Sequence, residues 1–163
     1  MRKAVMIFLI AIFWHLNLNA TVFSIFFPLE VKDWKVKEFK GKANYKIVET
    51  PKKLIKLISE ESSFNLVKDF SIDISQYPYL NFEWMVEVLP ESGDVRFKDK
   101  DDQSAQIYVI APSFPEMINY KGIGYIWDTK CPTGDYKSTK TTNIKYIVLK
   151  SGTKDINKLV KEK

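Results

Sequence analysis

Histidine and cysteine are almost absent from this sequence. Each occurs once in 163 residues, as His15 and Cys131. A single cysteine cannot form an internal disulfide, and His15 lies in an N-terminal segment that we expect to be removed. The remaining chain therefore offers no histidine-ligated metal site, no Ser-His-Asp triad and no Cys-His dyad. We interpret Cys131 as a spare thiol, because no histidine is there to activate it.

The N-terminus has the pattern of a secretory signal peptide. Met1–Lys3 is basic, residues 4–16 are apolar except for His15, and small residues before position 21 allow cleavage after Ala20. The pattern predicts a signal peptide at residues 1–20 and an exported protein of the periplasm or cell envelope. An exported protein without disulfides points to a bacterial envelope. An uncleaved membrane anchor is the alternative, because apolar residues resume at Val22–Phe27, and we expect membrane contact only through this segment.

Composition predicts one folded domain that does not bind nucleic acid. Apolar residues make up 45% of the chain and aromatic residues 14%, which is enough for a packed core. The net charge is +5, but the lysines are spread along the chain, whereas nucleic-acid binding needs a concentrated patch. We expect the domain at residues 30–150, followed by a short polar tail at residues 151–163 with apolar residues at helical spacing.

The clearest strand signals lie between Tyr79 and Thr129. Apolar residues alternate with mostly polar residues across Leu80–Leu89, and a period of two recurs at Ala105–Ile110 and Ile123–Asp128. Prolines and glycines separate these runs, as expected for turns between strands. Three aromatic and β-branched strands in sequence predict antiparallel all-β structure.

Weaker signals on either side predict further strands. Residues 33–39 and 43–48 predict a hairpin, and residues 64–74 and 143–149 each predict a strand. Residues 53–59 fit either a short helix or a strand, and their neighbours favour a strand. Short strands with frequent turns predict an antiparallel β-sandwich.

A set of residues spread over the chain resembles a known family. The set comprises Trp34, Phe39, Tyr45, Pro78, Leu80, Phe82, Trp84, Val86, Leu89, Pro90, Asp101, Asp102, Ala105, Ile107, Tyr108, Val109, Tyr125 and Trp127. In this pattern the chain resembles the bacterial family called domain of unknown function 3047 over residues 30–149. The resemblance implies an exported bacterial protein and supplies no established activity. The aromatic strands also resemble jelly-roll domains of the galactose-binding-like type, so the expected fold is a jelly roll.

The chain departs from the family pattern after its last expected strand. Family members typically carry an Arg-Asn-Val and Asp-Tyr type segment there, and residues 151–163 lack it. The resemblance therefore leaves the pairing of the final strand open, and an unpaired edge is an aggregation liability.

An acidic turn between the first two of the three clear strands is the candidate metal site. Calcium binds six to eight oxygens, several of them from carboxylates in a turn. Calcium is the only cofactor that the sequence indicates, and its candidate ligands are Asp94, Asp99, Asp101 and Asp102. The alternative is a solvated loop, in which Asp101 or Asp102 caps a turn or pairs with Arg96.

Aromatic side chains on the strands are the candidate ligand site. Tyr108, Tyr125 and Trp127 are predicted to form an exposed platform that stacks on sugar rings, with Glu83 beside them. The alternative is core packing, which we expect for Trp84 because it lies on the apolar face of its strand.

The leading functional hypothesis is a non-catalytic binding module, with no catalytic residue assigned. Its expected partner is a glycan or an envelope protein. One alternative is a carboxylate-dependent hydrolase that uses Glu83 with Asp101 or Asp102. The other is a protein-interaction scaffold that a partner completes by adding a strand.

Overall fold

A computed structural model describes residues 3–7, 34–49, 53–113, 119–137 and 143–163. Apart from a single 3₁₀ turn, η2 (Lys98–Lys100), the regular structure in these residues is β-strand, so the all-β prediction is confirmed. The strands are β1 (Lys3–Ile7), β2 (Lys35–Lys40), β3 (Asn44–Glu49), β4 (Lys53–Ile58), β5 (Ser63–Ser71), β6 (Phe82–Trp84), β7 (Ala105–Ser113), β8 (Asn119–Asp128), β9 (Gly134–Lys137), β10 (Ile144–Ser151) and β11 (Val160–Glu162).

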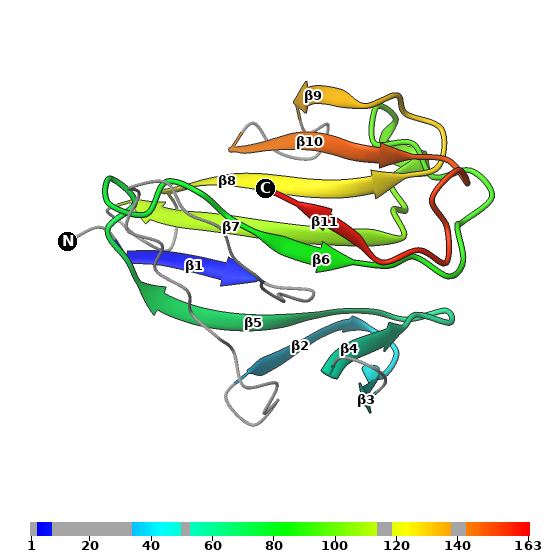
Figure 1. The fold of residues 1–163 in the computed structure, drawn as a ribbon, viewed down its shortest axis with the longest axis horizontal. Helices are drawn as coiled ribbons and strands as arrows, with labels where there is room; N and C mark the ends of the chain where they lie inside the picture. Colours follow the sequence, from blue (N-terminus) through cyan, green and yellow to red (C-terminus); the bar gives the residue numbers. More distant parts are fainter. Residues whose placement is uncertain (1–2, 8–33, 50–52, 114–118, 138–142) are drawn as a thin grey trace.

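Seven of these strands form the main sheet, in the order β2-β5-β1-β7-β8-β10-β9 (Figure 1). Neighbouring strands run antiparallel, as the sequence predicts, with one exception. β10 pairs in parallel with β8, and the register shifts between Val148 and Lys150. The parallel pair arises because β9 runs antiparallel to β10 and leads the chain back toward the starting end of β8 before β10 begins.

The N-terminal strand β1 lies inside the main sheet. It pairs antiparallel with β5 on one side and with β7 on the other. Its residues belong to the segment that we expect to be a signal peptide, whose residues 8–20 lie outside the described part of the chain. β1 separates β5 from β7 in the strand order, so the sheet is continuous only through β1. The described residues contain no helix that is long and apolar enough to span a membrane.

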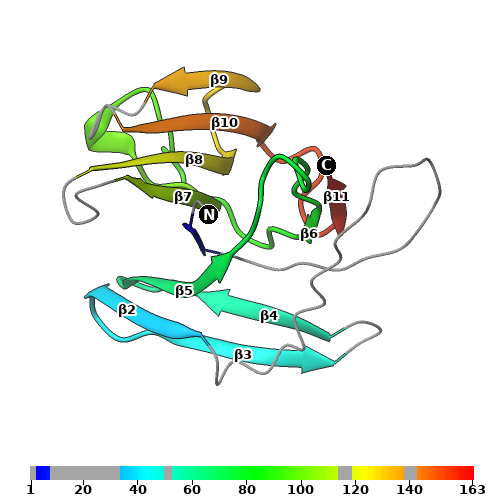
Figure 2. The same cartoon turned by 90° about the vertical axis from the view of Figure 1, so that its left-hand side faces the viewer.

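Two smaller sheets pack beside the main sheet. β3 pairs with β4, and β6 pairs with β11 (Figure 2). The hairpin expected from residues 33–39 and 43–48 is therefore wrong. Its strands form as β2 and β3, but β2 pairs with β5 and β3 pairs with β4. The strand preferred for residues 53–59 is confirmed as β4.

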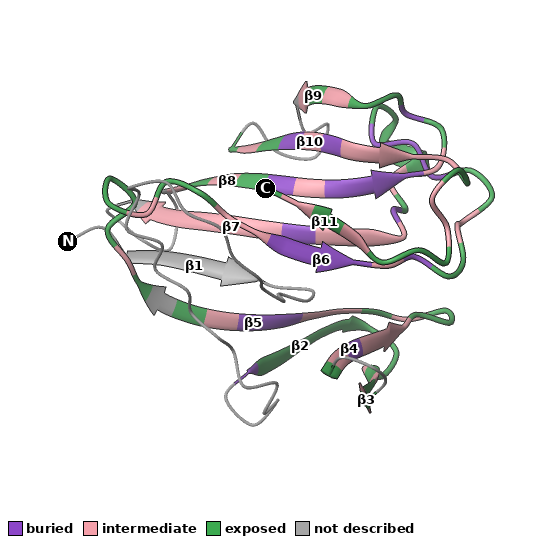
Figure 3. Cartoon of the chain, in the orientation of Figure 1, coloured by how far each residue is buried: buried purple, intermediate pink, exposed green. Residues whose placement is uncertain are grey.

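The two faces of the C-terminal strands bury separate apolar clusters. The first cluster joins the small sheets to the main sheet and contains Trp34, Ile55, Leu66, Phe82, Trp84, Val86, Ile107 and Trp127. The second lies on the other face and contains Val95, Ile126, Cys131, Tyr146 and Val148. Burial is accordingly concentrated in β6, β8 and β10, whereas β2 is exposed along its whole length (Figure 3).

Two expectations about strand length and the C-terminus are corrected. The strand expected at Leu80–Leu89 contains only Phe82–Trp84, because its partner β11 is itself three residues long. The expected apolar face continues to Val86, which is buried, and ends before Val88, which is 79% exposed. The segment expected to be a polar tail provides β11, and its Ile156 and Val160 pack against the first cluster.

Candidate ligand site

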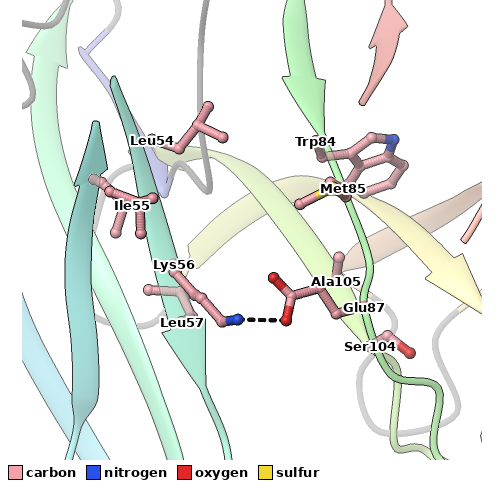
Figure 4. Close-up of a pocket in the computed structure, with 10 residues that line it drawn as sticks. Leu54, Ile55, Lys56, Leu57, Trp84, Met85, Glu87, Ser104 and Ala105 are labelled. Carbon is pink, nitrogen blue, oxygen red and sulfur yellow. Dashed lines mark hydrogen bonds and ion pairs between the residues drawn. The ribbon is translucent and has the colours of Figure 1, made fainter. Parts of the chain in front are cut away.

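A small, mostly apolar cavity lies between the β3–β4 hairpin and β6. Its volume is about 130 Å³. One wall comes from β3 and β4, and the other comes from β6 and the start of β7 (Figure 4). The lining residues are Val48, Leu54, Ile55, Lys56, Leu57, Trp84, Met85, Glu87, Ser104 and Ala105. A cavity of roughly 150 Å³ is large enough to hold a benzene ring.

The local sequences explain why the two walls stand where they do. In β4, Ile55 is buried in the first cluster, while Leu54 and Leu57 are only half-buried and face the cavity. In β6, Trp84 is 1% exposed and its indole Nε1 donates to Glu162 Oε1 of β11 over 3.3 Å. The indole therefore has a fixed position, and one part of it faces the cavity.

A buried hydroxyl without a hydrogen-bond partner lies in the cavity wall. Among the described residues, Ser104 Oγ is buried and accepts or donates no hydrogen bond. A buried hydroxyl without a partner costs free energy, commonly about 1–3 kcal/mol. The oxygen is closed off from the cavity, so a ligand there reaches it only after the Ser104 side chain rotates. Beside it, Gln103 Oε1 accepts from Gln106 Nε2 over 2.8 Å, while Gln103 Nε2 also has no partner among the described residues.

An ion pair spans the cavity. Lys56 of β4 pairs with Glu87, which follows β6, and Figure 4 shows the two side chains meeting between the walls. The side chains are 35% and 42% exposed, so the pair is partly screened by water and adds little stability. It marks the polar end of a cavity that is otherwise apolar.

The predicted aromatic platform is divided between the two faces of the sheet. Tyr125 and Trp127 share one face of β8, where the register places them opposite Ile107 and Ala105. Tyr108 pairs with Gly124 and faces the other side, where its ring lies 6.2 Å from that of Tyr146. The three aromatic residues therefore cannot contact one ligand together.

The burial of these side chains also contradicts the prediction of an exposed platform. Trp127 is fully buried and its indole Nε1 donates to the carbonyl of Gly152 over 3.1 Å, so the expectation that it is exposed is wrong. Tyr125 is half-buried, and its ring packs 5.9 Å from that of Phe82. Burial raises the pKa of Tyr125, and burial together with Tyr146 raises the pKa of Tyr108. Both phenols therefore stay neutral and act as packing groups.

Gly124 makes the aromatic contact on the second face possible. A Cβ atom at this position would lie 2.8 Å from a ring carbon of Tyr146 and 2.9 Å from one of Tyr108. The glycine lets both rings lie directly over the backbone of β8.

Glu83 is buried at 6% exposure in the middle of β6. The β6–β11 register places Lys161 directly opposite it. A lysine opposite a glutamate is a favourable cross-strand pair, so Glu83 at this position can stabilise the pairing of β6 with β11.

The acidic turn does not gather its carboxylates into one site. Asp94 is buried and both of its oxygens accept from Arg96, Oδ1 from Nε over 2.9 Å and Oδ2 from Nη2 over 2.7 Å. The Arg96 guanidinium lowers the pKa of Asp94. Arg96 thus pairs with Asp94, whereas the sequence led us to expect a pair with Asp101 or Asp102.

The remaining candidate metal ligands lie on the surface of the same loop. Asp99 and Asp102 are exposed, and Asp101 is half-buried. Within the described residues, no three acidic, cysteine or histidine side chains lie close enough together to hold a metal ion. The loop is shaped by its backbone instead, since Asp94 N donates to Lys100 O and Asp102 N donates to the same carbonyl.

Asp128, which the sequence analysis did not single out, fixes the position of this loop. It is fully buried at the end of β8, and Oδ2 accepts from Val95 N over 2.9 Å. Oδ1 accepts from Lys130 N and Cys131 N over 2.9 and 2.8 Å. Aspartates that precede a turn often accept hydrogen bonds from nearby backbone N–H groups. The Asp-Thr-Lys-Cys-Pro run could therefore have predicted this role of Asp128 from the sequence.

Cys131 is buried beneath this loop in the second cluster. Burial raises the pKa of its thiol, which keeps it protonated and poorly nucleophilic. This agrees with the interpretation of Cys131 as a structural thiol.

The described residues thus form an all-β protein whose small, mostly apolar cavity is crossed by an ion pair. Residues 32–163 match the family described as "Protein of unknown function (DUF3047)", and the chain belongs to this family. The expected resemblance is confirmed, and the match extends through β11. Neither a curated protein nor a solved structure matches the chain.

Proposed function

We propose that this protein is an exported, non-catalytic binding module of the cell envelope. The single observation that supports a binding role best is the cavity between β4 and β6, with the Lys56–Glu87 ion pair across it. The signal-like pattern of residues 1–20 supports export.

The cavity favours a ligand of defined size and polarity. Its aliphatic and indole walls suit one apolar face, while the Lys56–Glu87 pair suits hydrogen-bonding groups at the edge. A ring of about the size of benzene that carries hydroxyl groups has this chemistry. One sugar residue of an envelope glycan therefore remains the proposed ligand, although it would use the cavity instead of the aromatic platform that the sequence indicated.

The hydrolase alternative has no observation in its favour. It needs Glu83 together with Asp101 or Asp102, and β6 places Lys161 opposite Glu83. Among the residues that the structure describes, no cluster of three acidic groups offers a second route to carboxylate chemistry.

The experiment is titration calorimetry of the purified protein with monosaccharides and short oligosaccharides from envelope glycans, and with phenol as a ring-sized non-sugar. Glu87→Gln should weaken the binding of a sugar about tenfold, because a charged hydrogen-bond acceptor at the edge of the cavity becomes neutral. Leu57→Trp should abolish binding by filling the cavity.

Glu91→Gln is the matched control, since Glu91 is exposed and lies outside the cavity lining. Binding that all three variants leave unchanged would place the ligand elsewhere. If phenol binds and no sugar does, the cavity is a site for apolar rings and the carbohydrate proposal fails.

A further inference from the structure

The place of β1 in the sheet conflicts with removal of residues 1–20. Among the described strands, β1 alone hydrogen-bonds to both β5 and β7, and cleavage after Ala20 would remove it. We infer that Thr21–Phe27 takes the place of β1 between β5 and β7 once the signal is removed. This inference rests on the export part of the proposed function and is independent of the cavity.

An empty slot between β5 and β7 would leave two rows of backbone groups without partners. β1 uses the edge of β5 at Lys68–Ser71 and the edge of β7 at Tyr108–Ile110. Unpaired backbone groups away from water are costly, and unpaired edges promote aggregation. A replacement strand is therefore strongly favoured over a vacant slot.

On its β7 side the slot suits a strand with apolar residues on both faces, whereas on its β5 side Lys68 is half-buried and Asp69 and Ser71 are exposed. Val109 and Ile110 of β7 point to opposite faces beside the slot, and both are half-buried. Strands that are covered on both faces have nearly continuous apolar sequences. Val22–Phe27 reads VFSIFF, with Ser24 as its only polar residue, and Pro28 follows directly as a strand terminator.

The register shows that the chain can reach the slot. Met6 of β1 pairs with Lys68, and Lys35 at the start of β2 pairs with Val67, the next residue of β5. β1 therefore ends level with the start of β2, on the opposite side of β5. The slot and β2 are two strand spacings apart, roughly 10 Å. The seven residues of Pro28–Trp34 can span up to roughly 23 Å, so they suffice for the crossing.

The direction of the chain is also retained. A segment that enters the slot and then crosses β5 to β2 runs parallel to β2, as β1 does, and is therefore antiparallel to β5 and β7. Because Thr21–Phe27 is tethered to β2 by a short connection, its effective concentration at the slot is on the order of millimolar or higher. A strand from another protein would have to compete against that concentration.

The test uses protein that is exported and processed from its full precursor, with the N-terminus read by mass spectrometry. Hydrogen exchange then reports on Lys68–Ser71 and Tyr108–Ile110. In the processed protein we expect these amides to be protected. Ile25→Pro should speed their exchange at least about tenfold, because proline cannot complete a ladder between two strands. Leu29→Pro, placed in the connection, is the control and should change nothing.

A disulfide trap provides a second measurement that does not depend on the proline variant folding. If Phe27 takes the position of Ile7, which pairs with Tyr108, then position 26 lies opposite Val109. Phe26→Cys combined with Val109→Cys should crosslink on mild oxidation, and Phe26→Cys combined with Lys121→Cys, on β8, should not.

Each remaining outcome decides against the inference. A purified chain that still begins at Met1 overturns the export proposal and the strand replacement together. A processed chain whose slot amides exchange freely, or whose cysteines do not crosslink, overturns the strand replacement alone. In that case, protection that appears only after another protein is added would identify a strand supplied by a partner.

Discussion

The two parts of the main sheet on either side of β1 are built differently. On the C-terminal side, β7, β8 and β10 bury apolar residues on both faces, in two separate clusters. On the N-terminal side, β5 buries Leu66 in the first cluster and Val67 outside both clusters. β2 is an exposed edge strand, and an ion pair of 2.6 Å links its Lys35 to Asp69 of β5. The β3–β4 hairpin meets the rest of the protein partly across a cavity.

The comparison shows which part of the protein can accommodate a ligand. Densely packed strands lose stability with most substitutions, whereas the less densely buried layer of β2, β3 and β4 has room for a cavity and polar groups. The ligand-sized cavity lies where the N-terminal layer meets β6, and the C-terminal layer provides the rigid support.

The largest expected effect is a difference in stability between a substitution on the C-terminal side of β1 and one on the N-terminal side. Trp127→Ala should lower the free energy of unfolding by about 3–5 kcal/mol, because it leaves a large cavity in the first cluster. Phe39→Ala in β2 removes an aromatic residue that is 65% exposed and should change it by less than about 0.5 kcal/mol. Urea denaturation measures both, and equal losses would contradict the comparison.

The next effect concerns the loop that Asp128 holds against the C-terminal strands. Asp128→Ala should cost about 2–4 kcal/mol, since two buried backbone N–H groups, those of Val95 and Cys131, lose their acceptor. Asp128→Asn keeps one oxygen acceptor and should cost less. Asp102→Ala in the same acidic loop is the control and should leave the melting temperature unchanged, because Asp102 is exposed.

A smaller effect depends on pH and has opposite signs at two carboxyl groups. Burial raises the pKa of Glu162 beside Trp84, so its contribution to stability is present below the ordinary pKa of glutamate and is lost as pH rises through the folded value. Glu162→Gln should therefore match the wild type near pH 4 and become the more stable protein near pH 7.

Asp94 should behave in the opposite way. Arg96 lowers its pKa, so its contribution is present above the ordinary pKa of aspartate and is lost as pH falls through the folded value. Asp94→Asn should lose stability at pH 7 and converge with the wild type in acid. Thermal melts between pH 3 and 7 measure both variants, and parallel profiles would show that neither group titrates as described.

The smallest expected effect is that of calcium. Thermal melts with millimolar calcium and with EDTA should coincide, because Arg96 occupies both oxygens of Asp94 and the other acidic groups of the loop are dispersed. Binding to the folded state alone would raise the melting temperature with ligand concentration. Such a rise would restore the acidic turn as a metal site.

The sequence predicted the strands better than their partners. β7, β8 and β10 were expected because alternation of apolar residues is a local signal, and the structure bears it out. The parallel pairing of β8 with β10 and the separation of β2 from β3 depend on contacts between distant residues, which a local pattern does not contain. The length of β6 was overestimated for the same reason, since β11 limits it.

The candidate site was harder to predict than the fold. Tyr108, Tyr125 and Trp127 all fit an aromatic platform by composition, but the register of β7 against β8 assigns them to two faces. The cavity draws its lining from β3–β4, from the residues around β6 and from the start of β7, so no single stretch of sequence reveals it. Of the residues discussed here, only Asp128 has a local sequence pattern, an aspartate before a turn, from which its role could have been predicted.

The pairing of β6 with β11 also bears on the order in which the chain folds. Trp84 and Glu162 touch although they are 78 positions apart, whereas β3–β4 and β9–β10 pair across short connections. Contacts between distant positions form late, because the intervening chain must first be brought into a loop. Trp84 belongs to the first cluster and Val160 packs against that cluster, so its side beside Trp84 is covered only after residues 160–162 have been synthesised. Until then the indole of Trp84 lacks the hydrogen-bond acceptor that Glu162 provides.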